Sequence, residues 1–128
     1  MPTLLVVDDQ PGIRHLLIEV FRDQGVSVIT AGTGSEALVC LKAERPDVLL
    51  LDVKLPGGDG FFVLHEARKL FPHLPVILMT GYREGELACE AVARQESGVV
   101  AVLRKPFDIF EARRLVLKLC LAPLAQEA

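Results

Sequence analysis

Five short apolar segments, each ending on polar or turn-forming residues, recur along the chain and predict five β-strands. The third segment, Val48–Leu51, is unbroken by any polar residue and stops at Asp52. A strand that is buried on both faces of a sheet has this pattern, so we predict that the third strand is central. The five expected strands are Thr3–Val7, Val26–Ala31, Val48–Asp52, Pro75–Thr80 and Val99–Arg104.

Stretches of helical periodicity follow each of the expected strands. Pro11 suits the first turn of the first helix. The sequence Thr-Gly-Ser-Glu at residues 33–36 has the capping-box pattern and begins the second helix. The third and fourth helices are expected over about Phe61–Leu70 and over Glu86–Glu96, and Asp108 caps the fifth.

This fivefold alternation of strand and helix predicts an α/β fold. Right-handed crossovers convert it into a parallel sheet that is covered by helices on both faces. The doubly wound, flavodoxin-like (βα)5 arrangement with strand order 2-1-3-4-5 fits five such units. The chain of 128 residues has the length of one domain, which we expect over residues 1–121, followed by a short frayed tail over 122–128.

Composition and charge narrow the classes of function. The net charge of −3 gives no basic surface, so direct binding of nucleic acid is not expected. The sequence contains no apolar run of membrane-spanning length and no signal-peptide pattern at its start. The three cysteines are widely spaced and odd in number, as is typical of reduced thiols. We therefore expect a cytoplasmic, monomeric domain.

Four strand ends carry the candidate chemistry: Asp8-Asp9, Asp52, Thr80 and Lys105. Crowded carboxylates raise one another's pKa values unless a cation offsets them, and hard oxygen ligands suit Mg²⁺. A carboxylate can also act as a nucleophile and form an aspartyl phosphate. A lysine charge and a threonine hydroxyl near such a phosphoryl group would help to position and neutralise it.

Each of these residues also has an ordinary explanation. An aspartate at a strand end often caps a helix, and an Asp-Asp pair in a loop is usually solvated. Thr80 alone would be a strand-end residue and Lys105 a surface lysine. Their combination at four converging strand ends favours a Mg²⁺ and phosphoryl site, with Asp52 as the acceptor.

Motifs at these positions resemble the receiver domain of two-component response regulators over nearly the whole chain. They are Val7-Asp8-Asp9, Leu50-Leu51-Asp52, Pro56-Gly57-Gly58-Asp59-Gly60, Met79-Thr80-Gly81 and Lys105-Pro106-Phe107. Within that family, residues 7–14, 19–21 and 105–109 are similar to the single-domain sporulation phosphorelay regulators of Bacillus.

The resemblance implies that Asp52 accepts a phosphoryl group from a phosphohistidine. It implies that Mg²⁺ is bound by Asp9, Asp52 and the backbone carbonyl of Lys54, with Asp8 near the metal or bound to it through water. It also implies that Thr80 and Lys105 bind phosphoryl oxygens and that the Lys105–Pro106 peptide bond is cis. The chain would then be a signalling phosphoacceptor that catalyses only its own phosphorylation and dephosphorylation, rather than an enzyme acting on other substrates.

The implied partner is a histidine kinase or a histidine phosphotransferase, which must cover the rim of the site to reach Asp52. We expect a stand-alone phosphorelay intermediate. The rim residues expected to form the partner surface are Gln10, Gly12, Ile13, Leu16, Pro56, Tyr82, Pro106 and Phe107.

The chain departs from the family pattern in two places, and one alternative function stays open. Val102 occupies the position, three residues before the lysine, where receivers commonly have an aromatic switch residue, and the stretch from Tyr82 to Gly98 is longer than in the sporulation regulators. The chain could instead be the excised N-terminal receiver of a DNA-binding transcription activator. A phosphatase of the haloacid dehalogenase type is set aside, because its general-acid aspartate would fall at Lys54.

Overall fold

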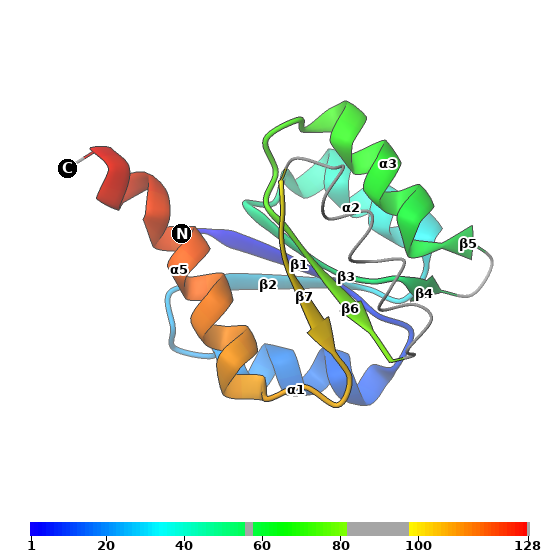
Figure 1. Cartoon of the computed structure of the whole chain (residues 1–128), viewed down its shortest axis with the longest axis horizontal. Coiled ribbons are helices and arrows are strands. Elements are labelled where there is room, and N and C mark those ends of the chain that lie inside the picture. The colour runs from blue at the N-terminus through cyan, green and yellow to red at the C-terminus, as the bar shows by residue number, and fades with distance from the viewer. Residues whose placement is uncertain (56–57, 82–97, 128) are drawn as a thin grey trace.

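The five main strands form one parallel sheet in the computed structural model, which describes residues 1–55, 58–81 and 98–127. The strands are β1 (Thr3–Val7), β2 (Ser27–Ala31), β3 (Val48–Asp52), β6 (Val76–Thr80) and β7 (Val99–Arg104). Their order across the sheet is β2-β1-β3-β6-β7 (Figure 1). Because β6 and β7 are the fourth and fifth of these strands, the predicted flavodoxin-like order 2-1-3-4-5 is confirmed.

The described helices cover both faces of this sheet. The helices α1 (Pro11–Phe21) and α5 (Ile109–Glu127) lie on one face, and α2 (Gly34–Glu44) and α3 (Gly60–Leu70) lie on the other (Figure 1). The helix predicted over Glu86–Glu96 lies outside the described residues. Among those residues, no helix has the length and apolar character that crossing a membrane would require.

The central strand β3 is buried along its whole length, as its apolar run predicts. Leu49 and Leu51 belong to the apolar core beneath α2 and α3, whereas Val48 and Leu50 belong to the core beneath α1 and α5. Burying a leucine side chain fully contributes about 1.5–3 kcal/mol of stability. A polar substitution inside β3 would therefore destabilise the layer that its side chain faces, and each of the two layers depends on residues of this one strand.

The expected capping residues begin their helices. The Thr33 hydroxyl accepts a hydrogen bond from the Glu36 N–H at 3.2 Å, and the Glu36 carboxylate accepts one from the Gly32 N–H at 3.1 Å. At the last helix, the Asp108 carboxylate accepts a hydrogen bond from the Phe110 N–H at 2.9 Å. These bonds satisfy backbone donors that a helix cannot satisfy within itself.

Two local predictions are corrected by the structure. The expected loop after Asp52 contains a short antiparallel pair, β4 (Lys54–Leu55) with β5 (Gly58–Asp59), which satisfies backbone groups beside the site. The helix α5 continues to Glu127, where a frayed tail from residue 122 is predicted. Pro123 disfavours a helix interior, so the helix continues here against that local preference, while the alanine, leucine, glutamine and glutamate residues of the segment favour helix. The domain boundary at residue 121 stays a prediction.

Candidate functional site

The register of the sheet brings the candidate residues to one edge. Val7 is paired with Leu51, so that the Asp8-Asp9 pair after β1 and Asp52 at the end of β3 reach the same level. Met79 is paired with Asp52. Thr80 is paired with Arg104, and Lys105 comes directly after that pair. All four predicted strand ends therefore meet at the carboxyl edge of the sheet, where open α/β sheets build their sites.

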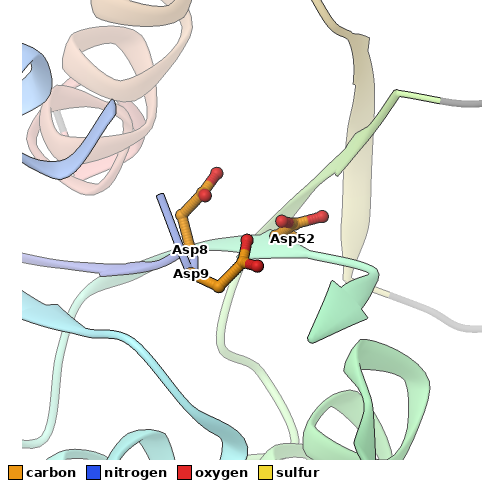
Figure 2. A group of neighbouring side chains, drawn as sticks. All are labelled: Asp8, Asp9 and Asp52. Carbon is orange, nitrogen blue, oxygen red and sulfur yellow. The ribbon is translucent and has the colours of Figure 1, made fainter. Parts of the chain in front are cut away.

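Three carboxylates form an acidic cluster at this edge: Asp8, Asp9 and Asp52 (Figure 2). One carboxylate oxygen from each lies within 4.8 Å of the others. Asp8 is fully buried and Asp52 is only 4% exposed, whereas Asp9 is exposed. Two buried carboxylates at this separation require a positive charge nearby, because burial and mutual repulsion both oppose their ionisation.

Lys105 supplies a positive charge to the cluster from the end of β7. Its Nζ atom lies 2.7 Å from Oδ2 of Asp8 and 3.1 Å from Oδ2 of Asp52. The Lys105 N–H donates a hydrogen bond to the Thr80 carbonyl at 2.7 Å, which fixes the backbone beside that strand. The Lys105–Pro106 peptide bond is cis, so this implication of the family resemblance is confirmed.

Thr80 ends β6 with its side chain buried at the same edge of the sheet. Lys54, whose carbonyl is the fourth predicted metal ligand, has an exposed side chain and begins β4. Its N–H donates to Oδ1 of Asp52 at 3.1 Å, so its backbone lies directly beside the Asp52 carboxylate. The roles of Thr80 toward phosphoryl oxygens and of the Lys54 carbonyl toward a metal stay predictions.

Gly60 is a site residue to which the sequence assigned no role beyond the turn-rich loop. Its N–H donates to the Val53 carbonyl at 2.8 Å, and Val53 in turn donates to the Met79 carbonyl at 3.0 Å. A Cβ atom on Gly60 would lie 2.6 Å from Cα of Val53 and still closer to the carbonyl oxygen of Asp52. The first residue of α3 must therefore be glycine for the helix to pack against the backbone of Asp52 and Val53.

Burial is the main influence on the ionisation of Asp52. Burial raises the pKa of Asp52 above its ordinary value, and the nearby charge of Asp8 also raises it. The Lys54 N–H hydrogen bond and the charge of Lys105 lower that pKa but do not cancel the effect of burial. For Lys105, burial lowers the pKa, but the hydrogen bond to Asp8 and the charges of Asp52 and Asp8 outweigh it, so the pKa is raised.

The raised pKa of Asp52 predicts how stability changes with pH. A carboxyl with a raised pKa stabilises the folded state while protonated, and this contribution is lost as pH rises through the folded-state pKa. Without divalent cations, we expect Asp52→Asn to be more stable than wild type near neutrality. Its advantage should shrink as the pH falls to about 4, where aspartates ordinarily begin to protonate.

Urea unfolding of both proteins across this pH range measures the effect. Lys105 does not contribute to the difference, because its raised pKa keeps it charged throughout the range. A stability difference that is constant with pH, or that favours wild type at neutrality, would contradict the assigned direction.

The acidic cluster fits a divalent cation. Within the described part of the chain, the buried Oδ2 of Asp8 has Lys105 as its one partner, with Nζ at 2.7 Å. A single ammonium group therefore faces the two buried carboxylates of Asp8 and Asp52, the exposed Asp9 carboxylate lies beside them, and hard oxygen donors of this kind suit a divalent cation. The carboxylates of Asp8, Asp9 and Asp52 could thus hold a metal ion.

A hollow of about 780 Å³ opens beside the cluster, and residues of the predicted partner surface line it. It brings together five of the eight residues expected there: Gln10, Ile13, Leu16, Pro106 and Phe107. Leu16 is 51% exposed, whereas Ile13 is half-buried against the core beneath α1 and α5. Gly12 is exposed but does not line the hollow. Pro56 and Tyr82 lie outside the described residues.

Val102 packs, half-buried, against the core beneath α2 and α3. The position that commonly holds an aromatic switch residue is therefore filled here by a small apolar side chain within the sheet. The stretch that is expected to be lengthened runs from Tyr82 to Gly98, and residues 82–97 of it lie outside the part of the chain that the structure describes.

A family model of the response regulator receiver domain matches residues 4–117. This match spans most of the chain and includes every residue of the acidic cluster and Lys105. The chain therefore belongs to the response regulator receiver domain family, and the family resemblance read from its motifs is confirmed.

Two curated relatives differ in how much of their length the chain covers. Sporulation initiation phosphotransferase F of Bacillus subtilis is 43% identical over 115 residues, which are 90% of each chain. The DNA-binding transcriptional regulator NtrC of Salmonella typhimurium is 40% identical over 111 residues, which are 87% of this chain but 23% of that protein.

Solved structures share the fold. A CheY-like response regulator receiver domain protein from Methanospirillum hungatei JF-1 superposes with a TM-score of 0.84 at 28% identity, covering 100% of this chain and 99% of that one. The receiver domain of NtrX from Brucella abortus gives a TM-score of 0.78 at 31% identity, covering 91% and 96% of the two chains.

Proposed function

We propose that this receiver accepts a phosphoryl group on Asp52 from a phosphohistidine of a histidine kinase or histidine phosphotransferase. The observation that carries the proposal is the triad of the buried Asp8 and Asp52 with the half-buried Lys105, in which one ammonium group bridges two carboxylates at 2.7 and 3.1 Å. From this position the Lys105 ammonium group can neutralise negative charge that develops on a phosphoryl group attached to Asp52. The adjoining hollow gives a donor access to that carboxylate.

The chemistry is a single displacement at phosphorus. A carboxylate oxygen of Asp52 attacks the phosphorus atom, the bond from phosphorus to the imidazole nitrogen breaks, and an acyl phosphate forms. The departing imidazole keeps the electron pair of the broken bond. Positioning and charge neutralisation supply most of the catalysis in such transfers.

Each residue of the site has a part in this step. The Lys54 N–H and the Lys105 ammonium group hold opposite oxygens of the Asp52 carboxylate, which fixes its orientation before attack. Lys105 and the hydroxyl of Thr80 would then contact phosphoryl oxygens. Asp8, Asp9, Asp52 and the Lys54 carbonyl would hold Mg²⁺, which when bound neutralises charge on the phosphoryl oxygens.

The favoured setting is a stand-alone phosphorelay intermediate. Its support is the relation to Sporulation initiation phosphotransferase F, which extends over 90% of both chains. The second candidate is the N-terminal receiver of a longer transcription activator, which the relation to NtrC favours. The length of the native reading frame distinguishes the two, because an activator would continue into further domains after α5.

The first helix provides a prediction about the partner. Ile13 and the exposed Leu16 line the hollow beside Asp52, and a few apolar side chains dominate the energy of most interfaces. We expect Ile13→Ala to slow phosphoryl transfer from a histidine-phosphorylated partner about tenfold, since a loss of 1.4 kcal/mol in docking has that effect. The measurement is the rate of transfer of labelled phosphate from the partner.

Acetyl phosphate is the internal control, because it needs no docking surface. Ile13→Ala should accept phosphate from acetyl phosphate at the wild-type rate. Val39→Ala is the matched variant elsewhere, since Val39 is an exposed apolar residue on α2. Equal losses with both donors would show that Ile13 supports the fold or the site, and no loss with either would place the docking surface elsewhere.

A further inference from the structure

Arg14 reaches from the first turns of α1 back to the end of β1. Its Nη1 atom donates a hydrogen bond to the backbone carbonyl of Asp8 at 2.7 Å. The side chain is half-buried and does not line the hollow beside Asp52. Arg14 therefore contacts the acidic cluster through the backbone carbonyl of Asp8 rather than through a carboxylate, and it does so from outside the hollow.

The carbonyl that Arg14 holds belongs to the peptide group that joins Asp8 to Asp9. Two further bonds fix the same loop: the Asp8 N–H donates to the Ala31 carbonyl at 3.1 Å, and the Gln10 N–H donates to Oδ1 of Asp8 at 2.9 Å. Neither of these bonds sets the orientation of the Asp8–Asp9 peptide group. The Arg14 bond does, and this orientation determines where the Asp9 side chain leaves the backbone.

Gly32 provides the space in which the guanidinium group lies. A Cβ atom built on Gly32 would lie 3.0 Å from Nη1 and 3.5 Å from Cζ of Arg14. The guanidinium group is thus placed between the end of β1 and the bare backbone that precedes α2. Contacts on both sides restrict the position from which it donates to Asp8.

We propose that Arg14 is a positioning residue, which orients the Asp8–Asp9 peptide group so that the Asp9 carboxylate faces the cation site. This inference rests on the proposed function in so far as that function includes Mg²⁺. Asp9 needs such support because it is the exposed member of the cluster, whereas Asp8 and Asp52 are held by burial and by Lys105.

The direction in which Mg²⁺ affinity changes when Arg14 is replaced distinguishes a positioning role from a purely electrostatic effect. Arg14 is a cation bonded to the backbone of Asp8, a member of the acidic cluster, so its charge alone opposes the binding of a divalent cation there. Removing that charge should strengthen Mg²⁺ binding if electrostatics dominates. Removing a residue that positions a ligand should weaken it, and losing a group that orients a metal ligand typically costs about tenfold or more in affinity.

The experiment is a calorimetric titration with Mg²⁺ of wild type, Arg14→Met and Arg14→Lys, with urea unfolding of each protein in parallel. Arg14→Met removes the donors but keeps an apolar stem, and Arg14→Lys keeps a charge and a donor. Arg22→Met is the matched control, because Arg22 follows the far end of α1 and is paired with the exposed Glu19. We expect about tenfold weaker binding for Arg14→Met, recovery of most of the affinity in Arg14→Lys, and no change in Arg22→Met.

Unchanged or tighter Mg²⁺ binding by Arg14→Met would overturn the inference, even if the variant is less stable. Should that variant fail to fold, Arg14→Gln supplies the same comparison, and wild-type affinity in it would equally reject the role. A wild-type protein that binds no Mg²⁺ would instead refute the metal in the proposed function. Wild-type binding with no effect at Arg14 would refute only the positioning role.

Discussion

Replacing Gly60 with alanine is expected to destabilise the protein by about 3 kcal/mol, the upper end of the usual cost of overpacking. The added methyl group would lie 2.6 Å from Cα of Val53 and closer still to the carbonyl oxygen of Asp52. Both are backbone atoms, which cannot move aside as a flexible side chain can. The start of α3 and the backbone of Asp52 would have to separate, so the site would be distorted as well.

Urea unfolding measures this loss, and Gly12→Ala is the matched control. Among the residues that the structure describes, a Cβ atom on Gly12 would have no neighbour within 4 Å, and Gly12 lies in the first turn of α1. Alanine there should be neutral or should stabilise the protein by up to about 1 kcal/mol, because glycine is the poorer helix former. Similar stabilities for the two variants would show that α3 does not depend on close contact with the Asp52 backbone.

Replacing Asp9 with asparagine is expected to weaken Mg²⁺ binding at least about tenfold. Removing a residue that only orients a metal ligand usually has an effect of this size, and Asp9 is itself a predicted ligand. Asp9 is the exposed carboxylate of the cluster, and its counterparts Asp8 and Asp52 are already paired with Lys105. The substitution removes a full negative charge and replaces a carboxylate oxygen with a weaker amide ligand. Calorimetric titration with Mg²⁺ measures the change.

Asp23→Asn is the matched control for this charge change. Asp23 is exposed beyond the far end of α1 and has a φ of 64°, which asparagine also adopts readily. Its affinity for Mg²⁺ should equal that of wild type. If Asp9→Asn and Asp23→Asn behave alike, the acidic cluster does not bind the cation through Asp9.

The sequence predicted the parts of the fold that depend on apolar periodicity. The unbroken run of β3 predicted a central strand, and the topology then placed Asp8-Asp9, Asp52, Thr80 and Lys105 at one edge. The antiparallel pair β4 and β5 was not predicted, because strands of two residues have no periodicity to detect. The helical course of α5 to Glu127 was missed because a terminal segment was expected to fray.

Contacts made through the backbone could not be predicted from the sequence. The glycine in position 60 was read as a turn residue, and only the structure shows that it lies against the carbonyl of Asp52. No pattern in the sequence indicates that the Arg14 guanidinium group bonds to a main-chain oxygen. Ile13 was predicted to lie on the partner surface, and it proves to lie half-buried at the edge of the hollow.

The central claim is that Asp52 is the phosphoacceptor, and mapping the modified residue tests it most directly. Wild type and Asp52→Asn would be treated with acetyl phosphate and Mg²⁺, trapped by borohydride reduction of the acyl phosphate, and analysed by peptide mass spectrometry. We predict one modified residue in wild type, Asp52, and no modification of the Asn variant. Equal modification of Asp52→Asn, or a modified residue other than Asp52 in wild type, would contradict the account.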